Sequence, residues 1–183
     1  MELIGFILGF LYLWLELRAC IYLWIVGAIM PAVYAFVYFD AGLYADCGIQ
    51  VYYILAAIYG WVIWAFKRKE DASELPISSM PGRYYAPLSV VALVCFGLLS
   101  FLLVRYTDST VPYSDAFTTA LSIAAMWMLS RKYVEQWLVW CVVDALYVVL
   151  YIYKDLYFTA VLYAVYTLIA VYGYLDWKKK SVG

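Results

Sequence analysis

Long apolar runs occupy most of this 183-residue sequence and restrict its fold more than any other feature. A helix rises about 1.5 Å per residue, so about 20 apolar residues cross a bilayer core of about 30 Å. The sequence predicts an all-α membrane protein. Its seven transmembrane segments are expected at Glu2–Leu15, Ala19–Phe39, Leu43–Phe66, Pro87–Val104, Asp115–Leu129, Tyr133–Tyr153 and Leu156–Trp177. Pro31, inside the second segment, is tolerated where neighbouring helices satisfy the freed carbonyl.

The composition agrees with a polytopic membrane protein. The chain is 68% hydrophobic and only 14% charged, whereas soluble domains are about half apolar and about a quarter charged. Histidine is absent, and the four cysteines stand singly without a CxxC pair. Because histidine is the commonest metal ligand and neutral-pH acid/base group, its absence predicts no metal site. Single, scattered cysteines predict no disulfide framework. We also expect no cofactor.

Basic residues predict the orientation of the chain. They lie in alternate connections, which are cytoplasmic by the positive-inside rule: Arg18, Lys67-Arg68-Lys69, Arg131-Lys132 and Lys178-Lys179-Lys180. The other connections carry acidic or mixed charge: Asp40, Asp46, Arg105, Asp108, Lys154 and Asp155. Seven crossings then place the amino terminus outside and the carboxyl terminus in the cytoplasm. The longest break, Lys67–Arg83, contains prolines, serines and mixed charge, and predicts an exposed loop.

One acidic residue, Asp144, lies in the middle of the sixth segment. A carboxylate at that depth costs about 2.5–3.5 kcal/mol, so we expect it to face protein or water rather than lipid. Spacings of three and four place aromatic residues on the same helix face: Trp137, Trp140, Tyr147 and Tyr151. A carboxylate framed by aromatic rings suits an organic cation. Simple packing is the alternative, and it stays open for Trp137 and Tyr151 in particular.

The sequence repeats itself at an offset of 113 residues. LYADCGIQVYYILAAIYGWVIW, from Leu43, aligns without gaps with LYFTAVLYAVYTLIAVYGYLDW, from Leu156. The same offset pairs Arg18 with Arg131, Trp24 with Trp137, Tyr34 with Tyr147, Tyr38 with Tyr151, and Pro31 with Asp144. We predict two parallel three-helix bundles, 1–66 and 115–183, joined by a loop and linker helix at 67–114. Repeat proteins of this kind that transport a substrate hold it near the midplane, between the copies.

A glutamine also occurs in the middle of an apolar segment. Gln50 corresponds to Tyr163 in the repeat and shares a helix face with Tyr53 and Trp61. It is able to hydrogen-bond a ligand. It is equally able to form an interhelical hydrogen bond, typically worth less than about 1 kcal/mol, and the sequence leaves both possibilities open.

The motifs resemble those of the PnuC family of bacterial vitamin transporters. They are RKYVEQWLVW (131–140), the mid-helix Asp144, KDLYFTAVLY (154–163), LYADCGIQ (43–50) and YGWVIW (59–64). The resemblance covers nearly the whole chain. It implies a SWEET-like 3+1+3 fold and a homotrimer in the bacterial inner membrane. It further implies facilitated diffusion without ion coupling, made one-way when a cytoplasmic kinase phosphorylates the arriving vitamin.

The resemblance also implies a binding site. Trp137, Trp140 and Asp144 match positions of a binding helix, and Gln50 matches a binding glutamine. In relatives that carry nicotinamide riboside, the positions of Asp144 and Gln136 are typically asparagine, and a third asparagine lies near the position of Met30-Pro31. A carboxylate in place of amides favours thiamine, with nicotinamide riboside, also a cation, as the alternative. The expected substrate-binding residues are Asp144, Trp140, Trp137, Gln136, Gln50, Tyr53, Tyr147, Tyr163 and Tyr34.

Two other classes of function are less consistent with the sequence. A membrane-embedded enzyme is disfavoured because histidine, paired acids and a Gly-rich phosphate loop are all missing. A scaffold gains nothing from the insertion cost of Asp144 and Gln50. We therefore predict a transporter without enzymatic activity, whose partners are a small cationic vitamin and the lipid bilayer, with no role for nucleic acid.

Overall fold

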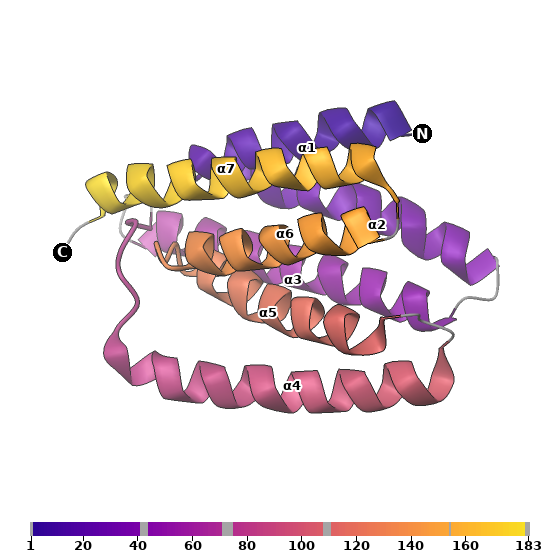
Figure 1. The fold of residues 1–183 in the computed structure, drawn as a ribbon. Coiled ribbons are helices and arrows are strands. Elements are labelled where there is room, and N and C mark those ends of the chain that lie inside the picture. The colour runs from indigo at the N-terminus through magenta and orange to yellow at the C-terminus, as the bar shows by residue number, and fades with distance from the viewer. Residues whose placement is uncertain (1, 41–43, 71–74, 108–110, 154, 182–183) are drawn as a thin grey trace. The chain divides into compact units, whose positions relative to one another are not determined.

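The structure, a computed structural model, describes residues 2–40, 44–70, 75–107, 111–153 and 155–181. These residues form seven α-helices and one 3-10 turn, and their only β-type pairing is an isolated bridge between Ser78 and Tyr133 (Figure 1). The helices are α1 (Glu2–Leu17), α2 (Tyr22–Asp40), α3 (Tyr44–Glu70), α4 (Tyr85–Tyr106), α5 (Pro112–Ser130), α6 (Gln136–Tyr153) and α7 (Tyr157–Lys180), and the 3-10 turn η1 is Gly82–Tyr84.

The seven helices correspond to the seven predicted segments, with ends that differ by a few residues. Helix α5 begins at Pro112 rather than Asp115, because proline suits the first helical position, where its missing N–H would have no partner. Helices α2 and α6 begin later than predicted, at Tyr22 and Gln136. For α2 the reason is the positive φ of Ala19, 48°, which a right-handed helix cannot include. The all-helical prediction is confirmed over the described residues.

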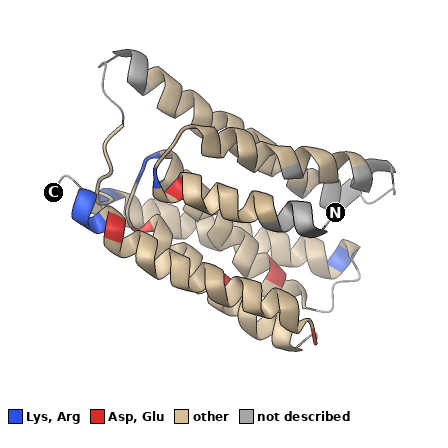
Figure 2. Ribbon diagram, turned by 90° about the horizontal axis from the view of Figure 1, so that it is seen from above, with Lys and Arg blue, Asp and Glu red and all other residues tan. Residues whose placement is uncertain are grey.

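Among the described residues, three stretches are long and apolar enough to cross a membrane by themselves. They are Gly82–Tyr106, Gln136–Tyr153 and Tyr157–Lys180. Shorter apolar stretches lie in the first three helices, at Ile7–Leu17, Tyr22–Phe36 and Gln50–Phe66. In Figure 2 most of the described ribbon is tan, and the blue and red segments that mark charged residues lie mainly near helix ends. Crossing by all seven helices, and the orientation of the termini, stay predictions.

The chain divides into two compact units. The first contains residues 1–76 together with 130–132; in it α2 packs along α3, and α1 packs against α2. The second contains residues 77–129 and 133–183, and in it α6 packs along α7 (Figure 1). Helix α4 thus belongs to the same unit as α5–α7. The three-part division of the sequence at 66 and 114 stays a prediction.

The repeat in the sequence is also a repeat in backbone geometry. Helices α1 and α5 end at equivalent residues, Leu17 and Ser130, and each is followed by a positive-φ residue, Ala19 or Lys132. The turns carry matching hydrogen bonds: Cys20 N donates to Leu15 O at 2.9 Å, and Tyr133 N donates to Met128 O at 3.0 Å. Both turns therefore reverse the chain in the same way.

Two tryptophan pairs repeat the packing as well. The rings of Trp24 and Trp64 meet edge to face at 5.4 Å and 83°, and those of Trp137 and Trp177 meet at 5.6 Å and 87°. In each unit a glycine of the following helix lies against the inner tryptophan, because a Cβ atom there would overlap the indole: Gly60 against Trp24 and Gly173 against Trp137. The repeat thus preserves a helix–helix contact that requires both an indole and a glycine.

One part of the predicted exposed loop Lys67–Arg83 packs within the second unit. There, Val134 N donates to Ser78 O at 3.0 Å, and Met80 N donates to Glu135 Oε2 at 2.9 Å. The Met80 side chain is buried in a cluster with Met128 and Tyr133, whereas Ser79 is exposed as predicted. The prediction is wrong for Met80 because the residues just before α6 hold this segment. We call Ile77–Met80 the strap.

Several residues used in the sequence analysis have side chains outside the described part of the structure. They include Met30, Tyr38, Asp40, Asp46, Lys67, Arg68, Lys69, Asp108, Lys154 and one of the four cysteines, Cys47. The charge-based orientation rests partly on these residues and keeps its status as a prediction.

Candidate functional site

Asp144 lies near the middle of α6 and is buried, with 8% of its surface exposed. This agrees with the expectation that the carboxylate does not face lipid. Within the described part of the chain, no basic side chain forms an ion pair with it. A buried and unpaired carboxylate in an apolar helix is costly, and such residues commonly mark a substrate or ion pathway.

Four tyrosines from α6 and α7 lie together beside this carboxylate. Tyr163 is the central ring: its centroid is 4.9 Å from Tyr147, 5.3 Å from Tyr151 and 5.7 Å from Tyr166. The planes of Tyr151 and Tyr163 differ by only 18°, so these two rings stack. Asp144 lies close enough to interact electrostatically with Tyr147, Tyr163 and Tyr166. We call these four residues the tyrosine cluster.

Polar side chains lie beside the cluster. The Tyr151 hydroxyl is near that of Tyr163, and the Tyr147 hydroxyl is near Thr118 of α5. Thr118 is itself buried and donates to the backbone oxygen of Ser114 at 3.0 Å. The second unit thus surrounds the rings with groups from three helices, α5, α6 and α7.

The first turn of α6 contributes buried polar atoms. Gln136 is completely buried, and neither its Oε1 nor its Nε2 has a hydrogen-bond partner among the described residues. The same holds for the indole nitrogens of Trp137 and Trp140. Leaving a buried donor or acceptor unpaired costs about 1–3 kcal/mol, so such atoms normally bind water or a ligand. These groups are therefore candidates for hydrogen bonds to a substrate.

Trp137 differs from the other predicted ring contacts. Its indole is 1% exposed, lies against Gly173 and meets the edge of Trp177. Trp24 makes the same contacts in the first unit, which indicates that this indole packs the helices. Its ring faces are occupied by protein, so we regard Trp140 and the tyrosine cluster as better placed to stack on a ligand.

The remaining predicted site residues, Tyr34, Gln50 and Tyr53, belong to the first unit. Gln50 and Tyr53 are half-buried on α3, and Tyr34 on α2 is 38% exposed. Trp61, predicted to share their face, is 45% exposed and points outward. A site built from both repeats stays a prediction.

Sequence reasoning missed three polar residues, Tyr166 and Thr118 in the second unit and Glu16 in the first. Tyr166 is the repeat partner of Tyr53, so the offset of 113 residues could have identified it. Thr118 gave no signal, because its role depends on a contact between α5 and α6. Glu16 is 1% exposed and lies near Tyr12, although its position beside Arg18 is typical of a surface residue.

Residues 1–179 match the profile of a family described as nicotinamide mononucleotide transporter. The chain belongs to the PnuC family. Membership of the PnuC family makes it a membrane vitamin transporter, as the motifs indicate.

Named members of the PnuC family resemble the chain over almost its whole length. The nicotinamide riboside transporter PnuC of Escherichia coli is 27% identical over 200 aligned positions, covering 96% of this chain and 84% of the relative. The riboflavin/roseoflavin transporter RibM of Streptomyces davaonensis is 26% identical over 183 positions, covering 98% and 85%. Both are transporters by name, which agrees with the prediction of a protein without enzymatic activity.

A solved structure of the PnuC family has the same fold. The crystal structure of the vitamin B3 transporter PnuC superposes with a TM-score of 0.71 over 95% of this chain and 78% of that chain. The sequence identity is 24%, so this likeness supports the arrangement of the helices and not the choice of substrate.

Proposed function

We propose that this PnuC-family chain imports nicotinamide riboside by facilitated diffusion across the bacterial cytoplasmic membrane. The named relatives include a nicotinamide riboside transporter and a riboflavin/roseoflavin transporter, and neither name mentions thiamine. They support nicotinamide riboside over thiamine, which the sequence analysis favours. Nicotinamide riboside therefore becomes the first candidate.

The observation that carries the proposal is the buried Asp144 beside the tyrosine cluster. The pyridinium ring of nicotinamide riboside is positively charged and flat. A carboxylate offsets its charge, and a tyrosine face contributes up to about 2 kcal/mol of cation–π attraction when water is excluded. A neutral ring gains much less from such a site.

Polar groups of the same unit suit the rest of the substrate. The side-chain amide of Gln136 offers both a donor and an acceptor to the carboxamide, and the indole N–H of Trp140 offers a donor to a ribose hydroxyl. Both groups are buried and have no partner among the described residues. Gln50 and Tyr53 of the first unit are proposed to complete the site, as the family resemblance implies.

The proposed mechanism is alternating access, in which the two repeats rock about a substrate held near the midplane. No coupling ion is invoked. A cytoplasmic kinase would phosphorylate the arriving vitamin and so keep the flux inward. The amino terminus outside, the carboxyl terminus inside and assembly as a homotrimer belong to the same proposal.

Thiamine is a second candidate because of Asp144 itself. The family resemblance implies an asparagine at this position in relatives that carry nicotinamide riboside, and a carboxylate suits a thiazolium with few hydroxyl groups. Both candidates are cations, so charge alone does not separate them.

Calorimetry on the purified protein tests the proposal with four ligands: nicotinamide riboside, its uncharged reduced form, thiamine and riboflavin. We expect nicotinamide riboside to bind tightest, and at least about tenfold more tightly than the reduced form, a difference of about 1.4 kcal/mol. Tighter binding of thiamine would select the second candidate. Equal affinity for the charged and reduced forms would show that the carboxylate does not recognise the cation.

A further inference from the structure

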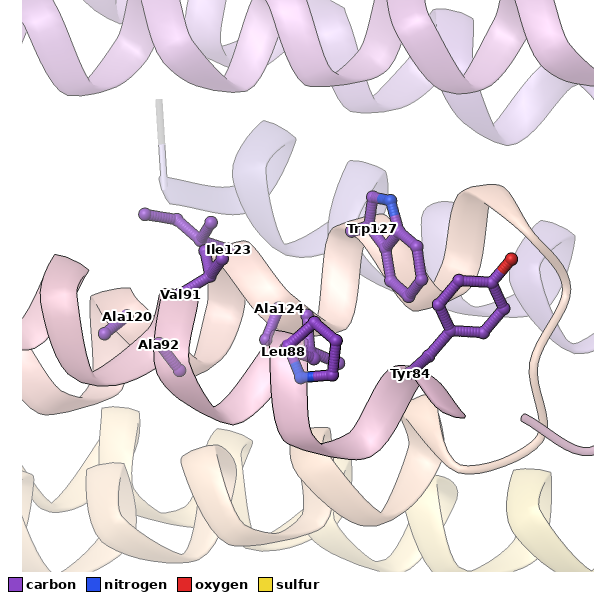
Figure 3. Close-up of a pocket in the computed structure, with 9 residues that line it drawn as sticks. Tyr84, Leu88, Val91, Ala92, Ala120, Ile123, Ala124 and Trp127 are labelled. Atoms are coloured by element: carbon purple, nitrogen blue, oxygen red, sulfur yellow. The ribbon is translucent and has the colours of Figure 1, made fainter. Parts of the chain in front are cut away.

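An apolar groove lies between α4 and α5 in the second unit, away from Asp144. It has a volume of about 320 Å³ and is lined by Tyr84, Pro87, Leu88, Val91, Ala92, Ala120, Ile123, Ala124 and Trp127. Figure 3 shows Tyr84 and Trp127 at one end, with Ala92, Val91 and Ala120 toward the other.

Small residues produce the hollow. Ala92 on α4 faces Ala120 and Ala124, one helical turn apart on α5, and both of the latter are buried. A leucine at any of these positions would occupy the space between the helices. From Tyr84 to Val91 the groove follows seven residues, or about 10 Å at the helical rise, which is about two-thirds of one leaflet of a 30 Å hydrocarbon core.

The end of the groove at Tyr84 is aromatic and rigid. The rings of Tyr84 and Trp127 meet edge to face at 5.7 Å, and both pack against the buried cluster of Met80, Met128 and Tyr133. Aromatic side chains gather where a helix passes from hydrocarbon to head groups. This end therefore marks a membrane surface, and the alanine end lies deeper.

A positive charge lies at the aromatic end. The guanidinium of Arg83 is 4.9 Å from the centroid of the Tyr84 ring, and its Nη2 donates to the Tyr84 hydroxyl at 3.1 Å. Arginine has five N–H donors in a fork that matches phosphate oxygens. The charge distribution along the sequence predicts that this end is cytoplasmic.

Helix α4 itself is strongly apolar. An 18-residue window within Gly82–Tyr106 has a mean hydropathy of 2.5, the highest of the three candidate spans among the described residues. Val91, at the rim, is 50% exposed, and its neighbours Leu93 and Val94 are more exposed still. A hydrocarbon chain that enters the groove would exchange contacts with other lipid chains for contacts with a protein surface that fits it. Basic pockets at this membrane level are typical sites for anionic lipid head groups.

We propose that the groove between α4 and α5 binds an anionic phospholipid, with one acyl chain along Leu88, Val91 and Ile123 and the phosphate at Arg83. The charge at one end and the apolar lining along the rest match the two parts of such a molecule. This site is separate from the vitamin site and does not depend on which vitamin is carried.

Native mass spectrometry of the purified full-length protein tests the proposal. Phosphatidylglycerol and phosphatidylcholine with identical acyl chains are titrated, and bound lipid is counted. We expect phosphatidylglycerol to bind at least about tenfold more tightly, and Arg83→Gln to remove most of that preference, a loss of about 1.4 kcal/mol. Arg105→Gln removes the same charge from the other end of α4 and should leave the preference unchanged.

A second pair of variants tests the groove itself. Ala92→Leu should weaken binding of both lipids, whereas Ala86→Leu, which adds the same bulk at an exposed position of α4 outside the lining, should not. Equal binding of the two lipids, or no effect of Arg83→Gln, would overturn the assignment of an anionic head group. If Ala92→Leu changes only the oligomeric state, a second copy of the chain covers the groove and the proposal is wrong.

Discussion

The indole ring of Trp137 lies directly over the backbone of Gly173, where an added Cβ atom would come within 2.6 Å of it. The repeat partners Trp24 and Gly60 are related in the same way. A glycine is required at both positions because the helices approach too closely for any side chain. The contact therefore fixes the separation of α6 and α7 in the unit that carries Asp144.

Gly173→Ala should destabilise the protein, because overpacking a close contact typically costs about 1–3 kcal/mol. Gly97→Ala is the matched control: Gly97 lies inside α4, and its Cβ would meet nothing within 4 Å. Alanine is a better helix former than glycine by about 1 kcal/mol, so this control should be neutral or stabilising. Thermal unfolding in detergent compares the two. Equal melting temperatures would mean that the indole moves aside without cost.

Asp144→Asn should weaken binding of the cationic vitamin at least about tenfold, or about 1.4 kcal/mol, because the amide keeps the shape of the side chain but not its charge. Binding of the uncharged reduced form of nicotinamide riboside should change much less. Asp176→Asn is the control, since Asp176 forms an exposed pair with Lys180 at 2.5 Å outside the site. Unchanged calorimetric affinity for the cation would remove Asp144 from the site.

Much of the fold could be predicted from the sequence because hydropathy and helical spacing are local properties. The seven helices, the burial of Asp144 and the equivalence of Trp24 and Trp137 in the repeat all follow from such patterns. The 113-residue offset also relates Ala19 to Lys132, and both have positive φ.

What the sequence did not reveal depends on contacts between segments. The strap reads Ile-Ser-Ser-Met between Pro76 and Pro81, and nothing in this sequence shows that Glu135 accepts a hydrogen bond from Met80 N. Similarly, only the packing of α5 beside α6 makes Thr118 a neighbour of Tyr147. Substrate choice lies further beyond local patterns, because asparagine and aspartate are isosteric and differ only in charge and hydrogen bonding.

Replacing the central ring of the tyrosine cluster should reduce vitamin binding. Tyr163→Leu removes a ring that contacts three others, and aromatic pairs contribute about 0.5–1.5 kcal/mol each, so we expect a loss of about tenfold or more. Tyr163→Phe keeps the ring and should retain most of the affinity. Tyr172→Leu, on the exposed side of the same helix, serves as the control. If Tyr163→Leu binds normally, the cluster is a packing feature and not part of the site.

The strap should loosen when its hydrogen bond to Glu135 is removed. Met80 N donates to Glu135 Oε2 at 2.9 Å, and hydrogen bonds to charged groups contribute about 1.5–3 kcal/mol. Glu135→Ala should therefore speed hydrogen exchange of the Met80 amide by about tenfold or more. Glu135→Gln keeps an acceptor oxygen and should retain part of the protection. Asp155→Ala, which removes an acceptor for the Tyr157 hydroxyl, should leave the Met80 amide unchanged. Unaltered exchange in Glu135→Ala would mean that burial of the Met80 side chain alone holds the strap, and Met80→Ser would then release it.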